Sequence, residues 1–112
     1  MAATEEENIT HLTEENFHKE IEKGLTLVDV FADWCGPCRM LTPVLKRVAK
    51  DVAGKARVAK LDIDDAQRIA TQLQVTSVPT MILFKDGKEV GRIVGLRDED
   101  AVKSFIQKEG RV

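Results

Sequence analysis

The segment Leu25–Phe31, with the sequence LTLVDVF, limits more than any other feature how this chain can fold. It is nearly all apolar and rich in β-branched residues, which is typical of a strand buried on both faces. Such a strand lies inside a sheet that helices cover on both sides. A predicted helix follows and runs to about Val52, with one apolar stripe at Leu41, Val44, Leu45, Val48 and Val52. The chain therefore has the pattern of an α/β domain.

The rest of the sequence alternates strand and helix patterns in the same way. Strands are also predicted at 8–12, 57–63, 80–84 and 89–94. Helices are predicted at 14–23 with Thr13 as N-cap, after Asp64 or Asp65, and around Val102 and Ile106. The early alternation indicates parallel strands, and the Asp86-Gly87 turn makes the last two strands antiparallel. We expect a mixed, roughly five-stranded sheet with helices on both faces.

Length and charge restrict the functions open to this domain. The 112 residues suffice for one core, so we expect a polar tail at 1–7 and a single domain at 8–112. The net charge is -2 with both signs interspersed, which favours neither nucleic acid nor a membrane surface as a partner. No run reaches the roughly 20 apolar residues of a membrane span, and the first residues lack the pattern of a secretory signal. We expect a cytoplasmic protein that acts as a monomer.

The two cysteines stand where the central strand hands over to the helix, in the sequence Trp34-Cys35-Gly36-Pro37-Cys38. The start of a helix has unpaired N–H groups and the positive end of the dipole, and both favour a thiolate at Cys35. Cys38 lies one turn further on the same face, so the two sulfurs can bond to each other. Pro37 stiffens the first turn, and Gly36 leaves the Cys35 sulfur open. The spacing therefore indicates thiol–disulfide exchange, because closing so short a loop stabilises little.

A zinc half-site is the alternative interpretation of the cysteine pair. Zinc usually takes four ligands, and besides the cysteines the chain offers only His11 and His18. These two histidines precede or lie on the first predicted helix, with a spacing that does not suit a zinc site. The residues thus favour redox chemistry, and we expect no bound metal or cofactor.

The cysteine motif and the segments around it resemble the thioredoxin family. WCGPC follows LVDVFA, and three further segments come in the family's order, namely 58–64 (VAKLDID), 77–80 (SVPT) and 84–87 (FKDG). The resemblance covers about 8–108 and implies the thioredoxin fold. The sequence departs from the family at Phe31, where many relatives carry Trp, and at Thr76-Ser77, which replace a pair containing Gly.

The resemblance also implies a substrate-binding surface around the cysteines. It implies a cis peptide bond at Val78-Pro79, whereas sequence alone favours trans, because only about 5–6% of X-Pro bonds in folded proteins are cis. A cis turn would leave the backbone of 76–78 free to pair with an extended substrate. The expected substrate-binding residues are Trp34, Gly36, Pro37, Ile63, Thr76, Ser77, Val78, Pro79, Val94 and Gly95, with Leu96 beside them. Taken singly, most of these suit ordinary core or loop positions equally well.

Asp29 is the one charged residue in the predicted central strand. A carboxylate there needs a strand end or bulge that reaches water, or a cation beside it. Lys60, on the next predicted strand, is the expected partner. The resemblance assigns Asp29 proton transfer with Cys38. We therefore place Asp29 and Lys60 in the expected catalytic group with the two cysteines.

Together these residues predict a general reductant of protein disulfides. Cys35 would attack a substrate disulfide, and Cys38 would then resolve the mixed disulfide. The resemblance implies an NADPH-dependent flavoprotein, thioredoxin reductase, as the electron donor. Two alternatives are an oxidant or isomerase on the same scaffold and a binding subunit of a larger enzyme. The dipeptide Gly36-Pro37 and the missing leader favour the reductant.

Overall fold

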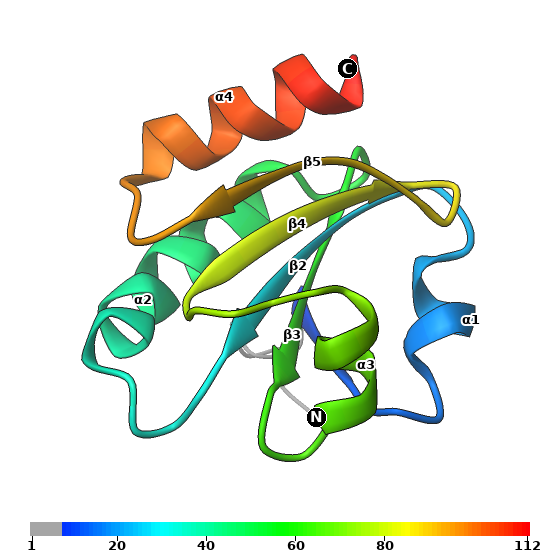
Figure 1. Cartoon of the computed structure of the whole chain (residues 1–112). Coiled ribbons are helices and arrows are strands. Elements are labelled where there is room, and N and C mark those ends of the chain that lie inside the picture. The colour runs from blue at the N-terminus through cyan, green and yellow to red at the C-terminus, as the bar shows by residue number, and fades with distance from the viewer. Residues whose placement is uncertain (1–7) are drawn as a thin grey trace, which may run out of the picture.

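The computed structural model describes residues 8–112 and shows five strands and four helices within them (Figure 1). The expected polar tail at 1–7 lies outside the described residues. The strands are β1 (Ile9–Leu12), β2 (Leu25–Phe31), β3 (Arg57–Asp62), β4 (Thr80–Lys85) and β5 (Lys88–Val94). The helices are α1 (Phe17–Ile21), α2 (Gly36–Asp51), α3 (Gln67–Gln72) and α4 (Glu99–Gly110). Within this part of the chain, no helix has the length and apolar character to cross a membrane.

The strands form one mixed sheet in the order β1-β3-β2-β4-β5. β1 and β2 both run parallel to β3, whereas β4 runs antiparallel to β2, and β5 antiparallel to β4. Asp29 of β2 lies in register with Lys60 of β3 on one side and with Met81 of β4 on the other. β2 is therefore the central strand, as its apolar sequence predicts, and all its residues except Phe31 are buried.

The antiparallel direction of β4 relative to β2 is a feature that the strand–helix alternation does not indicate. It follows from the length of α3, which has only 6 residues. A helix rises about 1.5 Å per residue and a strand about 3.3 Å, so α3 spans about half the length of β3. The chain does not return to the far end of the sheet, and β4 begins at the end where β2 and β3 finish. Residues 76–79 are thereby brought beside the start of α2.

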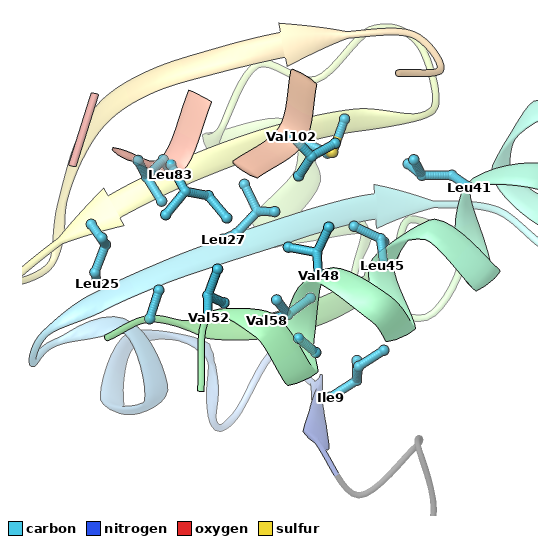
Figure 2. Close-up of a cluster of buried hydrophobic side chains, with 14 residues drawn as sticks. Ile9, Leu25, Leu27, Leu41, Leu45, Val48, Val52, Val58, Leu83 and Val102 are labelled. Atoms are coloured by element: carbon cyan, nitrogen blue, oxygen red, sulfur yellow. The ribbon is translucent and has the colours of Figure 1, made fainter. Parts of the chain in front are cut away.

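Two hydrophobic cores lie on opposite faces of the sheet. On one face, helices α2 and α4 pack against the strands through Leu41, Leu45, Val48, Val102, Leu27, Val58 and Leu83 (Figure 2). On the other face, the strands pack against Phe17 and Ile21 of α1 and Ile69 of α3. Leu25 and Leu27 belong to the α2 side and Val28 and Val30 to the α1 side. Because side chains alternate along a strand, Asp29 lies on the face that α2 covers.

The first helix is shorter than its sequence pattern predicts. α1 begins at Phe17 and not at residue 14, and its N-cap position is Asn16, not Thr13. The backbone N–H of Thr13 donates to Oδ1 of Asn16 over 2.7 Å, and the N–H of Asn16 donates to Oγ1 of Thr13 over 3.1 Å. This reciprocal pair holds 13–16 as a turn ahead of the helix.

The start of α3 also differs from the prediction. Ala66 occupies its N-cap position, and neither Asp64 nor Asp65 caps it through a side chain. The backbone N–H of Asp64 instead donates to Oδ1 of Asp62 over 2.8 Å. This local bond closes a tight turn after β3 and moves the beginning of the helix further along the chain.

Candidate active site

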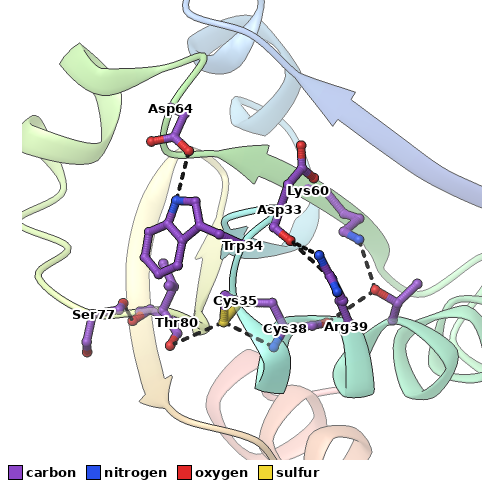
Figure 3. The surroundings of a disulfide bond; sticks show 11 residues. Asp33, Trp34, Cys35, Cys38, Arg39, Lys60, Asp64, Ser77 and Thr80 are labelled. Atoms are coloured by element: carbon purple, nitrogen blue, oxygen red, sulfur yellow. Dashed lines mark hydrogen bonds between the residues drawn. A yellow bond between two sulfur atoms is a disulfide. The ribbon is translucent and has the colours of Figure 1, made fainter.

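Cys35 and Cys38 form a disulfide at the point where β2 hands over to α2 (Figure 3). Their Cα atoms are 5.3 Å apart, which agrees with a spacing of one helical turn. Cys35 is the N-cap residue of α2, with an extended backbone at φ -89° and ψ 114°. The backbone N–H of Cys38 donates a hydrogen bond to Sγ of Cys35 over 3.2 Å. The first turn of the helix thus points a donor at the sulfur of Cys35, where it favours a thiolate.

The two residues between the cysteines lie at the surface of the first turn. Pro37 occupies the start of α2, where a missing N–H loses no helical hydrogen bond. A side chain at Gly36 would meet no atom of the protein within 4 Å. The cysteines themselves are only 5% and 3% exposed. A side chain at Gly36 would therefore fit the fold without a clash, but it would obstruct a partner that approaches the cysteines.

The segment before β4 forms the second part of the site. The Val78-Pro79 peptide bond is cis, and the carbonyl oxygen of Val78 lies 3.8 Å from Sγ of Cys35. The hydroxyl of Thr80 donates to the carbonyl of Ser77 over 2.7 Å, and the N–H of Gly95 donates to the carbonyl of Pro79 over 2.8 Å. Both bonds tie this segment to the sheet, so a backbone stretch is held beside the disulfide.

The expected rim residues are divided between the core and the surface. Ile63 and Val78 are partly buried and pack against the cluster that holds the disulfide. Thr76 and Ser77 are exposed, as are the apolar side chains of Trp34, Val94 and Leu96. The last three are 67%, 53% and 37% exposed. Their exposure at this end of the sheet is typical of a surface that meets another protein.

Trp34 lies beside the disulfide on the opposite side from Arg39 (Figure 3). Its indole Nε1–H donates to Oδ2 of Asp64 over 3.1 Å. Asp64, which does not cap α3, therefore orients the Trp34 ring. Arg39 donates from Nε and Nη2 to the carbonyl of Asp33, over 3.1 and 2.9 Å. These bonds fix the loop between β2 and α2 on both sides of the cysteines.

Asp29 is fully buried on the face of the sheet that α2 covers. Neither of its carboxylate oxygens has a hydrogen-bond partner among the described residues. Burial raises the pKa of Asp29 to about 7, and the charge of Lys60 opposes that rise. A carboxyl group with such a pKa gains and loses its proton near neutral pH, as a catalytic acid or base must.

Lys60 is the register partner of Asp29 and its charge opposes the rise in the pKa of Asp29, but no direct ion pair joins the two side chains. Its ammonium donates to Oγ1 of Thr42 over 3.3 Å and lies 4.4 Å from the centre of the Phe31 ring. The neighbouring strands fix where the two backbones meet. The hydroxyl of Thr42 on α2 and the face of the Phe31 ring determine the position of the Lys60 ammonium.

Thr42 is a residue of the site that sequence reasoning missed. Its hydroxyl donates to the carbonyl of Cys38 over 3.2 Å and accepts the bond from Lys60 over 3.3 Å. Thr42 stands four residues after Cys38, and this spacing on a helix places both on one face. That spacing is the signal that could have found it.

The described part of the chain has no cluster of metal-ligating side chains. Among residues 8–112, no group of three or more His, Cys, Asp or Glu side chains is arranged to hold a metal ion. The site joins a cysteine pair at a helix start with a backbone segment beside it, and a buried carboxyl group lies on the sheet face that α2 covers. An α/β domain with these parts is of the thiol–disulfide oxidoreductase class.

Comparisons with known proteins agree with the thiol–disulfide oxidoreductase class and identify the family of this chain. The family model described as Thioredoxin matches residues 8–108. A thioredoxin of Chlamydia trachomatis is 52% identical over 97 residues, which cover 87% of this chain and 94% of the relative. A thioredoxin of Staphylococcus saprophyticus is 43% identical over 100 residues, which cover 89% and 96%. The solved structure of a mutant thioredoxin from Halobacterium salinarum superposes with a TM-score of 0.83, at 36% identity and 96% coverage of both chains. The chain belongs to the thioredoxin family.

Family membership confirms two predictions made from the sequence. The fold is the thioredoxin fold, with its mixed sheet of five strands between two pairs of helices. The chain is a disulfide oxidoreductase, and its Cys35–Cys38 pair serves dithiol–disulfide exchange. Members of this family normally use disulfide substrates and thioredoxin reductase.

Proposed function

We propose that this chain reduces disulfides in other proteins, with Cys35 as the attacking thiol and Cys38 as the resolving thiol. The hydrogen bond from the Cys38 N–H to Sγ of Cys35 carries the assignment, because it favours negative charge on Cys35. The Cys35 thiolate attacks one sulfur of a substrate disulfide, and the other sulfur leaves with the electron pair. Cys38 then attacks Cys35, the bond to the substrate breaks, and the second substrate sulfur leaves reduced.

Asp29 and Lys60 act on the proton of Cys38. Cys38 must lose this proton before it attacks, and a carboxylate at Asp29 is a base with a pKa near neutral pH. Asp29 lies on the sheet face that carries α2, so it is directed toward the helix on which Cys38 stands. The nearby positive charge of Lys60 favours both the Asp29 carboxylate and the Cys38 thiolate.

The exposed surface around the disulfide receives the substrate. An extended peptide adds to the backbone of 76–78, next to the Val78 carbonyl that lies 3.8 Å from the Cys35 sulfur. The exposed apolar side chains of Trp34 and Val94 bury substrate side chains. Ile63, Pro79, Gly95 and the exposed residues Gly36, Pro37, Thr76 and Ser77 complete this surface.

Electrons reach the oxidised pair from an NADPH-dependent flavoprotein, thioredoxin reductase. The chain needs no cofactor of its own, because the two cysteines carry both electrons. We place this cycle in the cytoplasm and assign it to a monomer. Disulfide substrates and a reductase partner are what the family normally uses, and this supports the assignment.

Reduction of insulin disulfides with two cysteine variants tests the proposal. Cys35→Ser should abolish exchange, whereas Cys38→Ser should attack once and stay linked to its substrate. Normal turnover by Cys38→Ser, or first alkylation of Cys38 at neutral pH, would overturn the assignment of the two roles. A reduction potential measured on the wild type distinguishes the reductant from an oxidant on the same fold.

A further inference from the structure

Lys60 lines two clefts of different charge. One is a small cavity of about 90 Å³ lined by Phe31, Ala32, Asp33, Cys38, Arg39, Thr42 and Lys60. The other is a larger cleft of about 460 Å³, which shares Phe31 and Lys60 with the first. Its other charged or titratable lining residues are His11, Glu14, Glu15, Asp62 and Asp65. Four carboxylates in the larger cleft thus compete with the site for the ammonium.

Thr42 is the contact that holds the ammonium on the side of Cys38. Its hydroxyl accepts a hydrogen bond from Nζ of Lys60 over 3.3 Å and itself donates to the carbonyl of Cys38 over 3.2 Å. One hydroxyl group therefore links the lysine to the backbone of the resolving cysteine. No ion pair ties Lys60 to a carboxylate among the described residues. The Phe31 ring supports the position of the ammonium but provides no hydrogen bond.

We propose that Thr42 is a positioning residue, whose hydroxyl keeps the Lys60 ammonium beside Cys38 and so sets the rate of the resolving step. The inference rests on the proposed function, in which Cys38 gives up its proton and attacks Cys35. In that step the Cys38 proton passes to Asp29, the Cys35–Cys38 bond forms, and the substrate sulfur leaves with the electron pair. A positive charge held beside Cys38 favours its thiolate.

Loss of the hydroxyl should release the ammonium toward the carboxylates of the larger cleft. Other charged or titratable groups around Lys60 and Cys38 are Asp29 on β2, Asp33 in the loop after it, and Arg39 on α2. None of these groups holds the Lys60 ammonium in place of Thr42, because Arg39 is bound to the Asp33 carbonyl and Asp29 is not bonded to Lys60. Removal of the hydroxyl therefore moves positive charge away from both Cys38 and Asp29.

Thr42→Val, which keeps the shape and removes the hydroxyl, tests this position. Single-turnover release of a trapped substrate should slow about three- to tenfold at pH 7, and the midpoint of its pH profile should rise by about half a unit to one unit. Thr42→Ser should keep the wild-type rate and midpoint, because it keeps the hydroxyl. The first attack by Cys35 should not change in either variant. Thr71→Val, an exposed threonine on α3, is the matched control.

A double variant separates the positioning role from a structural one. Thr42→Val added to Lys60→Met should have no further effect on the release rate, because the charge that Thr42 holds is already absent. An unchanged rate and midpoint in Thr42→Val, a slow Thr42→Ser, or equal slowing in the Lys60→Met background would each overturn the inference. NMR titration of the Asp29 carboxyl in the reduced protein needs no turnover, so it tests the position even if the roles of the cysteines are wrong. Thr42→Val should raise the pH at which this carboxyl titrates, and an unchanged titration would contradict the proposal.

Discussion

Asp29 and Lys60 are register partners on β2 and β3, yet the lysine bonds to Thr42, and both carboxylate oxygens of Asp29 have no hydrogen-bond partner among the described residues. A buried carboxylate without a bonded partner is unstable as an ion. The nearby charge lowers its pKa only in part, and burial keeps that pKa at about 7. The raised pKa of Asp29 affects the stability of the fold and the rate of the resolving step, and the two effects can be measured separately.

The stability of the fold should fall as the pH rises through the range in which Asp29 ionises. Below pH 3.8 the group is neutral in the folded and the unfolded chain, so it has no ionisation penalty. Between 3.8 and about 7 the unfolded chain gains by ionising, and the free energy of unfolding decreases. Above about 7 the penalty is complete, at about 4 kcal/mol. Urea midpoints from pH 4 to pH 8 should therefore rise for Asp29→Ala relative to the wild type as the pH increases.

Asp65→Ala is the matched control for the stability measurement, because Asp65 is exposed. Its urea midpoint should follow that of the wild type at every pH. At pH 4 the cavity left by Asp29→Ala makes this variant equal to or less stable than the wild type. A difference between Asp29→Ala and wild type that does not change with pH would show that Asp29 is an ordinary carboxylate.

The resolving step should be slower without the Asp29 base. Asp29→Ala should slow single-turnover release of a mixed disulfide on the order of 10- to 100-fold at pH 7, because water replaces the carboxylate poorly. Attack by Cys35 should stay within about twofold of the wild type, since the helix start still favours its thiolate. Cys38 and Asp29 titrate as a coupled pair, so the pH profile of the wild type gives apparent values for the pair. Release at the wild-type rate in Asp29→Ala would remove Asp29 from the mechanism.

Trp34 is the only tryptophan of the chain and should report the state of the disulfide. Trp34 directly precedes Cys35 in the sequence, its ring is oriented by the bond to Asp64, and disulfides quench the fluorescence of indoles. Reduction with dithiothreitol should therefore increase its emission. Asp64→Ala removes the acceptor and should change the size of this increase, whereas Asp64→Asn keeps an oxygen acceptor and should retain it. Emission that is the same before and after reduction would show that Trp34 does not lie against the disulfide.

Gly110 packs so closely on the core that a methyl group should not fit. A Cβ at this position would lie 2.5 Å from Cδ2 of Leu25, which is buried at the start of β2. Gly110→Ala should therefore destabilise the fold by about 1–3 kcal/mol, measured as a shift of the urea midpoint. Leu25→Val should recover part of this loss when combined with Gly110→Ala, because it shortens the side chain in the way. Equal stability of Gly110→Ala and wild type would contradict the close contact.

The parts of the structure that the sequence predicts depend on local contacts. The apolar run of β2 predicts a central strand, and the spacing of Cys35 and Cys38 predicts that their sulfurs can bond, because both signals lie within a few residues. The neighbourhood of Lys60 depends instead on the hydroxyl of Thr42, 18 residues away in the sequence. The direction of β4 likewise depends on how far the short helix α3 carries the chain. Such features appear only when distant segments pack together.

The disulfide site consists of two halves that come from separate parts of the chain. Cys35 and Cys38 belong to one continuous segment, whereas the Val78 carbonyl comes from a segment 43 residues further on. We expect the first half to govern how readily the thiols react, and the second half to govern which proteins they meet. Exposed positions such as Thr76 and Ser77 could then vary during evolution to suit new partners, while the redox properties of the cysteine pair stay the same. A single domain of this kind can acquire new partner proteins without changing the redox chemistry of its cysteine pair.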